Sequence, residues 1–310
     1  MTDFEFLEMD RKQKIQSVIH KYGEEAFYIS FSGGRDSTIL SAFIDICLPG
    51  NRIPRVFANT GIEMNEIVKF VKQKADEDDR IVIIKPSVKI KQALDRDGYP
   101  FKSKSFAQKY PIYQKYGLEC KTIKTFFAGK SDRCCPERLK YIFTPWFEEN
   151  IGLKISDKCC ENMKEKPLRA YEKEAKRAPI IALLAEEGGR RAMAEGCLFF
   201  TKSNKLRSFT PFRPVPNKFL DYLADKYHIK LCKLYYPPFN FKRTGCKGCP
   251  FAIHLQDDLD TLHRYFPEEE KQAEAIWKPV YEEYRRIGYR LRPKTGQMDI
   301  WDFQREESNE

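Results

Sequence analysis

Apolar positions in the first third of the chain alternate between helical spacing and short continuous runs. Helical spacing begins with Leu7, Ile15, Val18, Ile19 and Tyr22 and ends at Gly23, since glycine favours the backbone conformation that closes a helix. Short apolar runs, which predict strands, occupy residues 26–31, 55–58 and 80–84. Helical patterns follow them at residues 37–47, 66–77 and 88–96. This order predicts an α/β fold with a doubly wound parallel sheet.

The alternation is lost over residues 102–158, which are aromatic and rich in lysine. Periodicity returns with a helix near residues 160–176, a strand at 179–184, a helix at 217–227 and a charged helix at 267–287. We therefore predict four parts. Residues 1–101 begin the α/β domain, 102–158 form a mixed, helix-rich insertion or lid, 159–255 complete the domain with the cysteine motifs, and 256–310 form a helical extension.

Composition and charge narrow the class of protein. The 310 residues are 42% hydrophobic, which is ample for a core, and 55 basic against 45 acidic residues give a net charge of +10. Such a surface suits a polyanion, but a plainly solvated basic surface explains it equally well. No apolar run approaches the roughly 18 residues of a membrane helix, and the acidic start lacks a signal-peptide core. We expect a cytoplasmic protein without a membrane partner.

Ten cysteines in a chain without an export signal favour metal or redox chemistry over disulfides, because the cytosol keeps thiols reduced. Cys134 and Cys135 are adjacent, Cys159 and Cys160 are adjacent, and residues 246–249 form a CxxC motif. Thiols this close in sequence are candidate metal ligands.

A glycine-rich segment, SGGRDS at residues 32–37, follows the first predicted strand and precedes a helix. Open α/β sheets bind ligands at this edge. Two glycines let the backbone approach an anion, and a helix N-terminus offers N–H donors. Ser30, Ser37 and Thr38 add hydroxyl groups, and Arg35 can neutralise a phosphate. The segment matches neither the Walker A nor the dinucleotide-binding pattern.

FSGGRDSTIL, at residues 31–40, resembles the pyrophosphate-binding loop of the phosphoadenosine phosphosulfate (PAPS) reductase family of the adenine nucleotide alpha-hydrolase superfamily, the PP-loop ATP pyrophosphatase type. VFANTGIE at 56–63, with Asn59 where Asp is usual, and GYPFKSK at 98–104 are similar to later motifs of that family. The resemblance extends over about residues 27–252. It implies an adenine nucleotide, either ATP or adenylyl sulfate, with Mg²⁺ at its phosphates. The implied binding residues are Ser30, Ser32, Gly33, Gly34, Arg35, Asp36, Ser37, Thr38, Asn59, Thr60 and Gly61.

The adjacent pair Cys159 and Cys160, which we call the tandem pair, is followed by Lys164 and Pro167. This spacing resembles that around the adjacent cysteines of cluster-bearing adenylyl-sulfate reductases. In those enzymes the tandem pair and a later CxxC hold a 4Fe-4S cluster. The resemblance thus implies that the cluster ligands are Cys159, Cys160, Cys246 and Cys249. Lys164, Lys242 and Arg243 would offset the negative charge of such a cluster.

Three alternatives for the cysteines stay open. Zinc accepts four thiolates as readily as a cluster does. Cys197 can replace one of the tandem pair, which would leave a reactive thiol. Cys134 and Cys135 can be the tandem pair instead, although they lack the Lys and Pro spacing.

Two departures from the family bear on the reaction. Reductases of this family attack sulfur with a cysteine near the C-terminus, but this chain has none after Cys249, so Cys197 or an insertion cysteine would have to serve. ALLAEEG at residues 182–188 stands where reductases have Gly, Arg and Ser for sulfonucleotide binding, and Leu184 and Gly188 supply neither that charge nor that hydroxyl. Arg190 and Arg191 follow and can compensate. The sequence therefore predicts that, relative to the family, the nucleotide site is kept and the reduction step is lost.

The leading hypothesis is a nucleotidyl-activating or sulfur-transfer enzyme that acts beside a cluster, with tRNA or DNA as acceptor and a sulfur donor or thiol reductant protein as partner. The residues expected to be catalytic are Arg35, Asp36, which holds Mg²⁺ or caps the helix, Lys164 and Cys197. A genuine adenylyl-sulfate or PAPS reductase is the alternative. A non-catalytic cluster protein that binds nucleic acid is the third hypothesis, and the sequence shows no base-reading element.

Overall fold

The computed structural model describes residues 2–127, 151–187 and 196–293. The chain divides into two compact units. Unit 1 comprises Met1–Ser87 and Met163–Gly245, and unit 2 comprises Val88–Asn162 and Cys246–Glu310. Each unit therefore joins two segments that are far apart in the sequence. In the described ranges, no helix is long and apolar enough to cross a membrane.

Unit 1 is built on a six-stranded sheet with the order β3-β2-β1-β4-β6-β5. Its strands are β1 (Phe27–Ser30), β2 (Arg55–Ala58), β3 (Ile81–Ile84), β4 (Ala178–Ile180), β5 (Leu198–Phe200) and β6 (Leu206–Phe209). All neighbours run parallel except β5, which pairs antiparallel with β6. The predicted α/β sheet is confirmed. The antiparallel edge hairpin was not predicted, because residues 196–209 lack a long apolar run.

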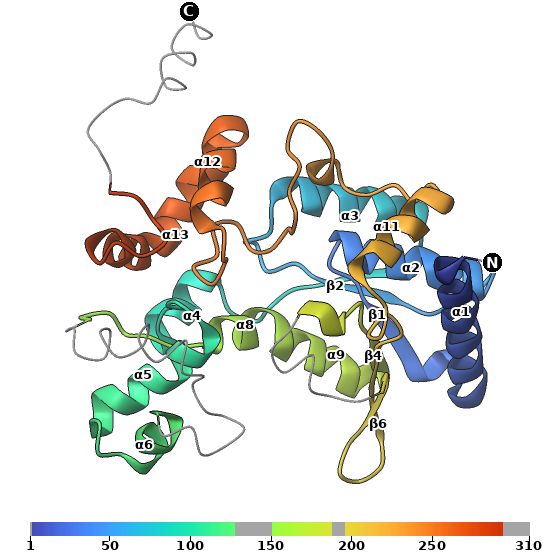
Figure 1. Cartoon of the computed structure of the whole chain (residues 1–310), viewed down its shortest axis with the longest axis horizontal. Helices are drawn as coiled ribbons and strands as arrows, with labels where there is room; N and C mark the ends of the chain where they lie inside the picture. The colour runs from blue at the N-terminus through green and yellow to red at the C-terminus, as the bar shows by residue number, and fades with distance from the viewer. Residues whose placement is uncertain (1, 128–150, 188–195, 294–310) are drawn as a thin grey trace, which may run out of the picture. The chain divides into compact units, whose positions relative to one another are not determined.

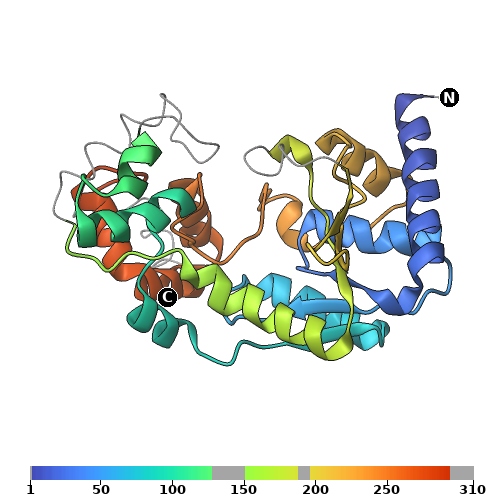
Figure 2. The ribbon, with the colours of Figure 1, turned by 90° about the horizontal axis from the view of Figure 1, so that it is seen from below.

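Helices cover both faces of this sheet, as a doubly wound fold requires. One face carries α1 (Asp3–Tyr22), α2 (Arg35–Cys47), α3 (Asn65–Glu77) and α11 (Asn217–Lys226), and α9 (Lys166–Ala175) lies on the other. Helices α1, α2 and α11 lie side by side (Figure 1, Figure 2). Short 3₁₀ turns are η1 (Glu24–Ala26), η3 (Ala185–Glu187) and η4 (Lys233–Tyr235).

The core of unit 1 lies between the sheet and α1, α2 and α11. Ile29 of β1 and Phe43 of α2 are fully buried, and the ring of Phe43 lies 5.7 Å from that of Phe212. These residues come from the apolar runs that predicted β1 and α2. Burial of this face fixes where β1 ends and α2 begins, and so positions the segment between them.

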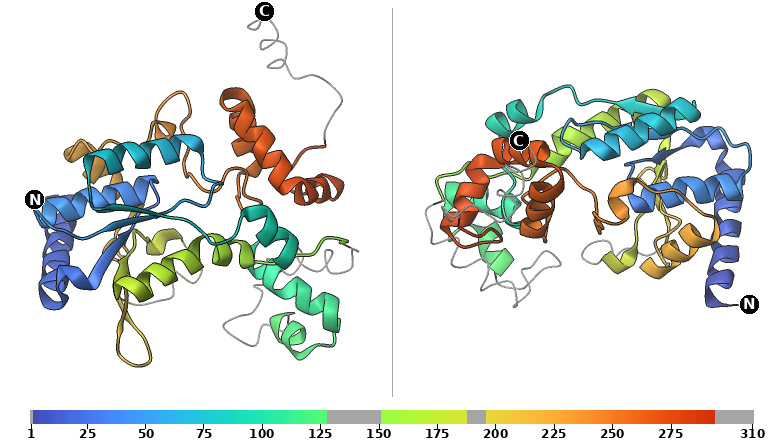
Figure 3. Two further views of the ribbon diagram at one scale, coloured as in Figure 1. Left: turned by 180° about the vertical axis from the view of Figure 1, so that it is seen from behind. Right: turned by 90° about the horizontal axis from the view of Figure 1, so that it is seen from above.

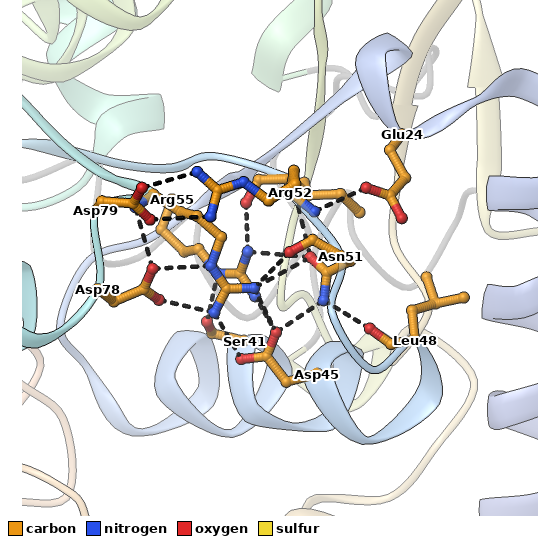
Figure 4. Close-up of polar contacts among 11 residues, drawn as sticks. Glu24, Ser41, Asp45, Leu48, Asn51, Arg52, Arg55, Asp78 and Asp79 are labelled. Carbon is orange, nitrogen blue, oxygen red and sulfur yellow. Dashed lines mark hydrogen bonds and ion pairs between the residues drawn. The ribbon is translucent and has the colours of Figure 1, made fainter.

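A polar network closes the edge of the sheet at the amino ends of β2 and β3 (Figure 4). Arg55 is 1% exposed, donates to Asn51 Oδ1 at 3.1 Å and pairs with Asp45 at 2.5 Å. Arg80 pairs with the same Asp45 at 2.9 Å and with Asp78 at 2.8 Å. A buried guanidinium needs such partners, since an unpaired buried charge is very costly. The network therefore fastens the strands to α2 at the edge opposite the glycine-rich segment.

Unit 2 is helical in its described part. It contains α4 (Ile90–Asp97), α5 (Lys104–Tyr116), α6 (Lys121–Phe127), α8 (Lys158–Cys160), α12 (Leu255–Tyr265) and α13 (Pro267–Arg286), and the π-helical turn η2 (Glu161–Glu165) follows α8. Helices α12 and α13 pack together (Figure 3). Aromatic rings fill the core, with Phe101 and Tyr284 centred 4.9 Å apart. Within the predicted insertion, the described residues 102–127 contain α5 and α6, and both belong to this unit.

Candidate functional site

Residues 32–37, which we call the glycine turn, join the carboxyl end of β1 to the start of α2. Gly33 has φ of 69°, in the left-handed region that favours glycine. A Cβ at this position would lie 2.7 Å from Val71 Cγ2 and 3.0 Å from Ile67 Cγ2. Both the backbone and the close approach of α3 therefore require glycine here.

The hydroxyl groups of the glycine turn hold its own backbone. Ser37 and Thr38 both donate to the carbonyl oxygen of Gly34, at 3.0 and 2.8 Å. The Gly34 N–H donates to Ser32 Oγ at 3.3 Å, and Ser32 Oγ lies 2.9 Å from Ser37 Oγ. Thr38 and Ser37 were expected to face an anion. In the structure they shape the turn, so the backbone N–H groups at the start of α2 are its natural anion donors.

A cavity of about 280 Å³, which we call the turn cavity, opens on the glycine turn. Ser30, Ser32 and Ser37, which were assigned from the sequence to a phosphate site, line it. Two cations, Lys242 and Arg243, also line it. Sequence reasoning assigned these two to a cluster, because only their closeness to Cys246 was visible. The full lining is Ser30, Ser32, Gly34, Arg35, Asp36, Ser37, Ile181, Ala182, Leu183, Tyr235, Lys242, Arg243 and Thr244.

Arg35 is anchored at the edge of this cavity. Its guanidinium pairs with Asp221 at 2.5 Å and with Asp36 at 3.1 Å, and donates to Asn217 Oδ1 at 2.8 Å. Its charge is thus shared between two carboxylates. Lys242 and Arg243 consequently add positive charge that a bound phosphate chain needs.

Asp36 is partly buried beside these cations. Burial raises the pKa of its carboxyl, and the charges of Arg35 and Arg243 act against that rise. A divalent cation would also stabilise the charged carboxylate. The position therefore suits the metal-holding role that the sequence left open for Asp36, and it suits a helix start as well.

Tyr235 and Thr244 are residues that the sequence did not indicate. Their hydroxyl groups are 2.5 Å apart, and a Cβ at Gly34 would lie 3.3 Å from the Tyr235 hydroxyl. Burial raises the pKa of Tyr235. A phenol hydroxyl is both a donor and an acceptor, so it can donate to an anion. Their position reflects the fold of residues 233–245 against α2, which no local pattern reveals.

The second predicted nucleotide segment, residues 59–61, follows β2. The Gly61 N–H donates to Asn59 Oδ1 at 3.2 Å, and Thr60 donates its N–H and hydroxyl to Glu63 at 2.9 and 2.7 Å. Glu63 is buried and pairs with Lys164 at 3.5 Å. The structure thus brings Lys164, expected to be catalytic, to the motif that follows β2.

A larger cavity of about 810 Å³ lies at the opposite edge of the sheet, beside the network of Figure 4. Its charged residues include Asp45, Asp78 and Arg80, which already bind one another. Parallel sheets bind ligands at the carboxyl ends of their strands, and this cavity lies at the amino ends. The turn cavity is therefore the better candidate, although it is smaller.

The CxxC turn, residues 246–249, is held from outside by α13. Trp277 Nε1 donates to the Lys247 carbonyl at 3.0 Å, Tyr281 donates to the Gly248 carbonyl, and Tyr284 donates to the Pro250 carbonyl at 3.0 Å. Lys247 itself is buried and pairs with Glu269 at 3.2 Å. Hydrogen bonds from α13 therefore hold the backbone of the turn that carries both thiols.

The tandem pair, Cys159 and Cys160, lies in α8 and belongs to unit 2, as does the CxxC turn. The four thiols fit a 4Fe-4S cluster or zinc in kind and number. Within residues 2–127, 151–187 and 196–293, however, no group of three or more His, Cys, Asp or Glu side chains is placed to hold a metal ion. We therefore derive no reaction step through a metal centre.

Cys197 belongs to unit 1, at the start of the edge hairpin. Its side chain packs against the core of the sheet, and its carbonyl accepts from the Thr210 N–H at 2.7 Å. Among the described residues, Cys197 does not line the turn cavity. Cys134, Cys135, Gly188, Arg190 and Arg191, which the sequence also singled out, lie outside the described residues.

The sequence matches no family model and no curated protein. Several solved structures resemble the chain, among them three enzymes. A phosphate complex of PAPS reductase from Candida auris has 10% identity and a TM-score of 0.44, and covers 79% of this chain and 96% of its own. It is an enzyme of the class that the sequence motifs resemble.

The NH₃-dependent NAD synthetase from Campylobacter jejuni subsp. jejuni NCTC 11168, in complex with nitrate, has 11% identity and a TM-score of 0.36, and covers 96% of this chain and 100% of its own. The U34-tRNA thiolase NcsA from Methanococcus maripaludis, with its [4Fe-4S] cluster, has 14% identity and a TM-score of 0.37. The match covers 94% of this chain and 82% of the thiolase chain. Likeness at this level does not determine an activity for the chain.

Proposed function

We propose that this protein is an adenine-nucleotide-dependent activating enzyme that binds the phosphate chain of ATP in the turn cavity. The observation that carries the proposal is the junction of the glycine turn, the start of α2 and two cations, Lys242 and Arg243, around one cavity at the carboxyl end of β1. Backbone N–H groups, a helix N-terminus and fixed cations are the elements that stabilise phosphate charge. The motif resemblance to PP-loop enzymes supports the same assignment.

In the proposed reaction, an oxygen of the acceptor attacks the α-phosphorus of ATP. The bond from that phosphorus to the bridging oxygen breaks, and pyrophosphate leaves with the electron pair. A sulfur nucleophile from a donor then displaces AMP, which departs with the acceptor oxygen. The glycine turn, Lys242 and Arg243 would stabilise the departing pyrophosphate, and Asp36 would hold the Mg²⁺ bound to it.

We further propose that Cys159, Cys160, Cys246 and Cys249 bind a 4Fe-4S cluster. Support comes from their shared unit and from the hydrogen bonds of α13 to the CxxC turn. Anaerobic purification with iron, sulfide and zinc analysis tests this. Iron and sulfide that are present in the wild type and lost together in Cys246→Ser support the cluster. Zinc without sulfide would show a zinc site and contradict the cluster.

The activity is tested by incubating the protein with Mg²⁺, sulfide as the sulfur nucleophile and ATP labelled at the α-phosphate, with and without bulk tRNA or DNA. AMP and pyrophosphate in equal amounts support the proposal. ADP and phosphate, or no cleavage under any of these conditions, contradict it.

The same preparation should be given labelled adenylyl sulfate and PAPS with a thiol reductant. Sulfite release would favour the reductase alternative. The packing of Cys197 against the core disfavours it, because a nucleophile of that chemistry must reach the sulfonucleotide.

A further inference from the structure

Unit 1 contains a third cavity, of about 990 Å³, which we call the α11 cavity. It shares Arg35, Tyr235 and Lys242 with the turn cavity, so the two adjoin along these side chains. Arg35 marks the boundary, since it lines both and binds Asn217 and Asp221 of α11. A molecule in the α11 cavity would therefore lie next to the phosphate chain of a bound nucleotide.

Helix α11 contributes a row of hydrogen-bond acceptors to the lining of this cavity. Asn217, Asp221 and Asp225 follow one another at intervals of four residues, so they share one helix face. Asp221 remains 61% exposed while its Oδ1 binds Arg35. Each of these side chains thus keeps oxygen atoms that can accept hydrogen bonds from a ligand.

The loop after η4 supplies flat apolar surface. Tyr236 is 46% exposed, yet its hydroxyl accepts from the Leu231 N–H at 3.2 Å and its own N–H donates to the Lys233 carbonyl at 3.0 Å. Phe241 also lines the cavity. An exposed aromatic ring held in place from both ends is suited to stacking, because little side-chain freedom remains to be lost on binding.

Lys230 and Lys242 complete the lining with exposed cations. The cavity therefore combines stacking surface, carboxylate acceptors and cations. The carboxylates would repel an inorganic anion, and an uncharged aliphatic ligand would pair with neither the carboxylates nor the cations. A planar ring with amino donors, attached to phosphate, uses all three features. Carboxylates accept hydrogen bonds from exocyclic amino groups of bases, and aromatic rings stack on unpaired bases.

We propose that the α11 cavity binds an unpaired nucleobase with an exocyclic amino group, such as cytosine, presented by a single nucleic-acid strand. In this assignment Tyr236 and Phe241 stack on the base, Asp225 accepts from its amino group, and Lys230 binds backbone phosphate. The role of this base as the acceptor rests on the function proposed above, but its binding does not require ATP.

The test measures fluorescence anisotropy of labelled oligodeoxycytidylate and oligothymidylate without ATP, on the full chain. Tyr236→Ala is expected to weaken binding of both by about tenfold, the usual scale for loss of one stacked base, while Tyr236→Phe keeps the ring and the affinity. Asp225→Ala removes the acceptor and should abolish a preference for the cytidylate strand, because thymine has no exocyclic amino group. Exposed residues of unit 2, in Tyr116→Ala and Asp257→Ala, are the matched controls.

Equal losses in Tyr236→Ala and Tyr116→Ala, a wild type that binds both strands equally, or a strand preference that survives in Asp225→Ala would overturn the inference. So would the absence of any strand binding by the wild-type protein. These outcomes are separate from the ATP assay. If ATP is cleaved but Tyr236→Ala binds normally, the cavity assignment fails alone, and if the strand binds as expected without cleavage of ATP, the proposed activity fails alone.

Discussion

The glycine turn and the CxxC turn both depend on a left-handed glycine, but they are held in opposite ways. Gly33 has φ of 69° and Gly248 has φ of 60°. The glycine turn is shaped by hydroxyl groups of Ser32, Ser37 and Thr38, all within its own few residues. The CxxC turn is shaped by aromatic side chains of α13, which donate to its carbonyls from about thirty residues further along the chain.

This difference suggests a division of roles. The hydroxyl hydrogen bonds that shape the glycine turn are local, and the start of α2 faces a cavity, as a ligand site needs. The carbonyl oxygens of the CxxC turn depend instead on side chains of α13. Changes in the first turn should therefore alter binding more than stability, and changes in the second should alter stability first.

The largest effect is expected from Gly33→Ala, measured as ATP cleavage. The methyl group would meet Val71 and Ile67, and the turn would shift away from the phosphate chain. Loss of preorganised N–H donors typically costs about a hundredfold in rate. Gly50→Ala is the control, because Gly50 has φ of 79° but nothing within 4 Å of the added methyl group. Equal activity in the two variants would contradict the assignment.

Gly248→Ala should produce the largest loss of stability. The added methyl group would overlap the Tyr281 hydroxyl and lie 2.8 Å from Ala273 Cβ. Backbone strain and overpacking together cost about 3 kcal/mol, seen as a lower urea midpoint. Gly288→Ala has a similar φ of 63° and open space, so it isolates the backbone contribution. If Gly248→Ala and Gly288→Ala lower the urea midpoint equally, the contact with α13 does not hold the CxxC turn.

The two patterns of contact explain what the sequence could predict. Strand β1, the glycine turn and α2 follow from a local succession of apolar run, glycines and helix, and the structure confirms them. Tyr235, Thr244 and the α13 side chains escaped prediction, because their partners are brought close only by the tertiary fold. The same holds for unit 2, which joins α4 and α5 to residues beyond Cys246. The cysteine assignment stays a prediction.

Tyr281→Phe tests the contact of α13 with the CxxC turn by removing a single hydroxyl group. It removes the hydroxyl that binds the Gly248 carbonyl and leaves a buried acceptor unsatisfied, which costs about 1–3 kcal/mol. Tyr116→Phe, at a 59% exposed site, should leave the urea midpoint unchanged. A Tyr281→Phe variant as stable as the wild type would show that the turn holds itself, as the glycine turn does.

The smallest effect concerns pH and the charge in the glycine turn. Burial raises the pKa of Asp36 above its unfolded value. The protonated carboxyl therefore favours the folded state, and this contribution is lost as pH rises through the folded pKa. The side chain introduced in Asp36→Asn cannot ionise, so the thermal midpoint of this variant should rise relative to that of the wild type as pH increases from about 4 toward neutral. A constant difference across that range would mean that Asp36 is not buried as described.

The most direct test of the central claim is calorimetric titration of ATP with Mg²⁺ into the wild-type protein and the double variant Lys242→Ala/Arg243→Ala. A second double variant, Lys12→Ala/Lys21→Ala, removes two cations from α1 as the control. We predict that ATP binds the wild type and the control alike and binds the Lys242→Ala/Arg243→Ala variant at least about tenfold more weakly, the loss expected when charge-assisted contacts to phosphate are removed. Equal affinity in all three proteins would contradict binding of the phosphate chain in the turn cavity.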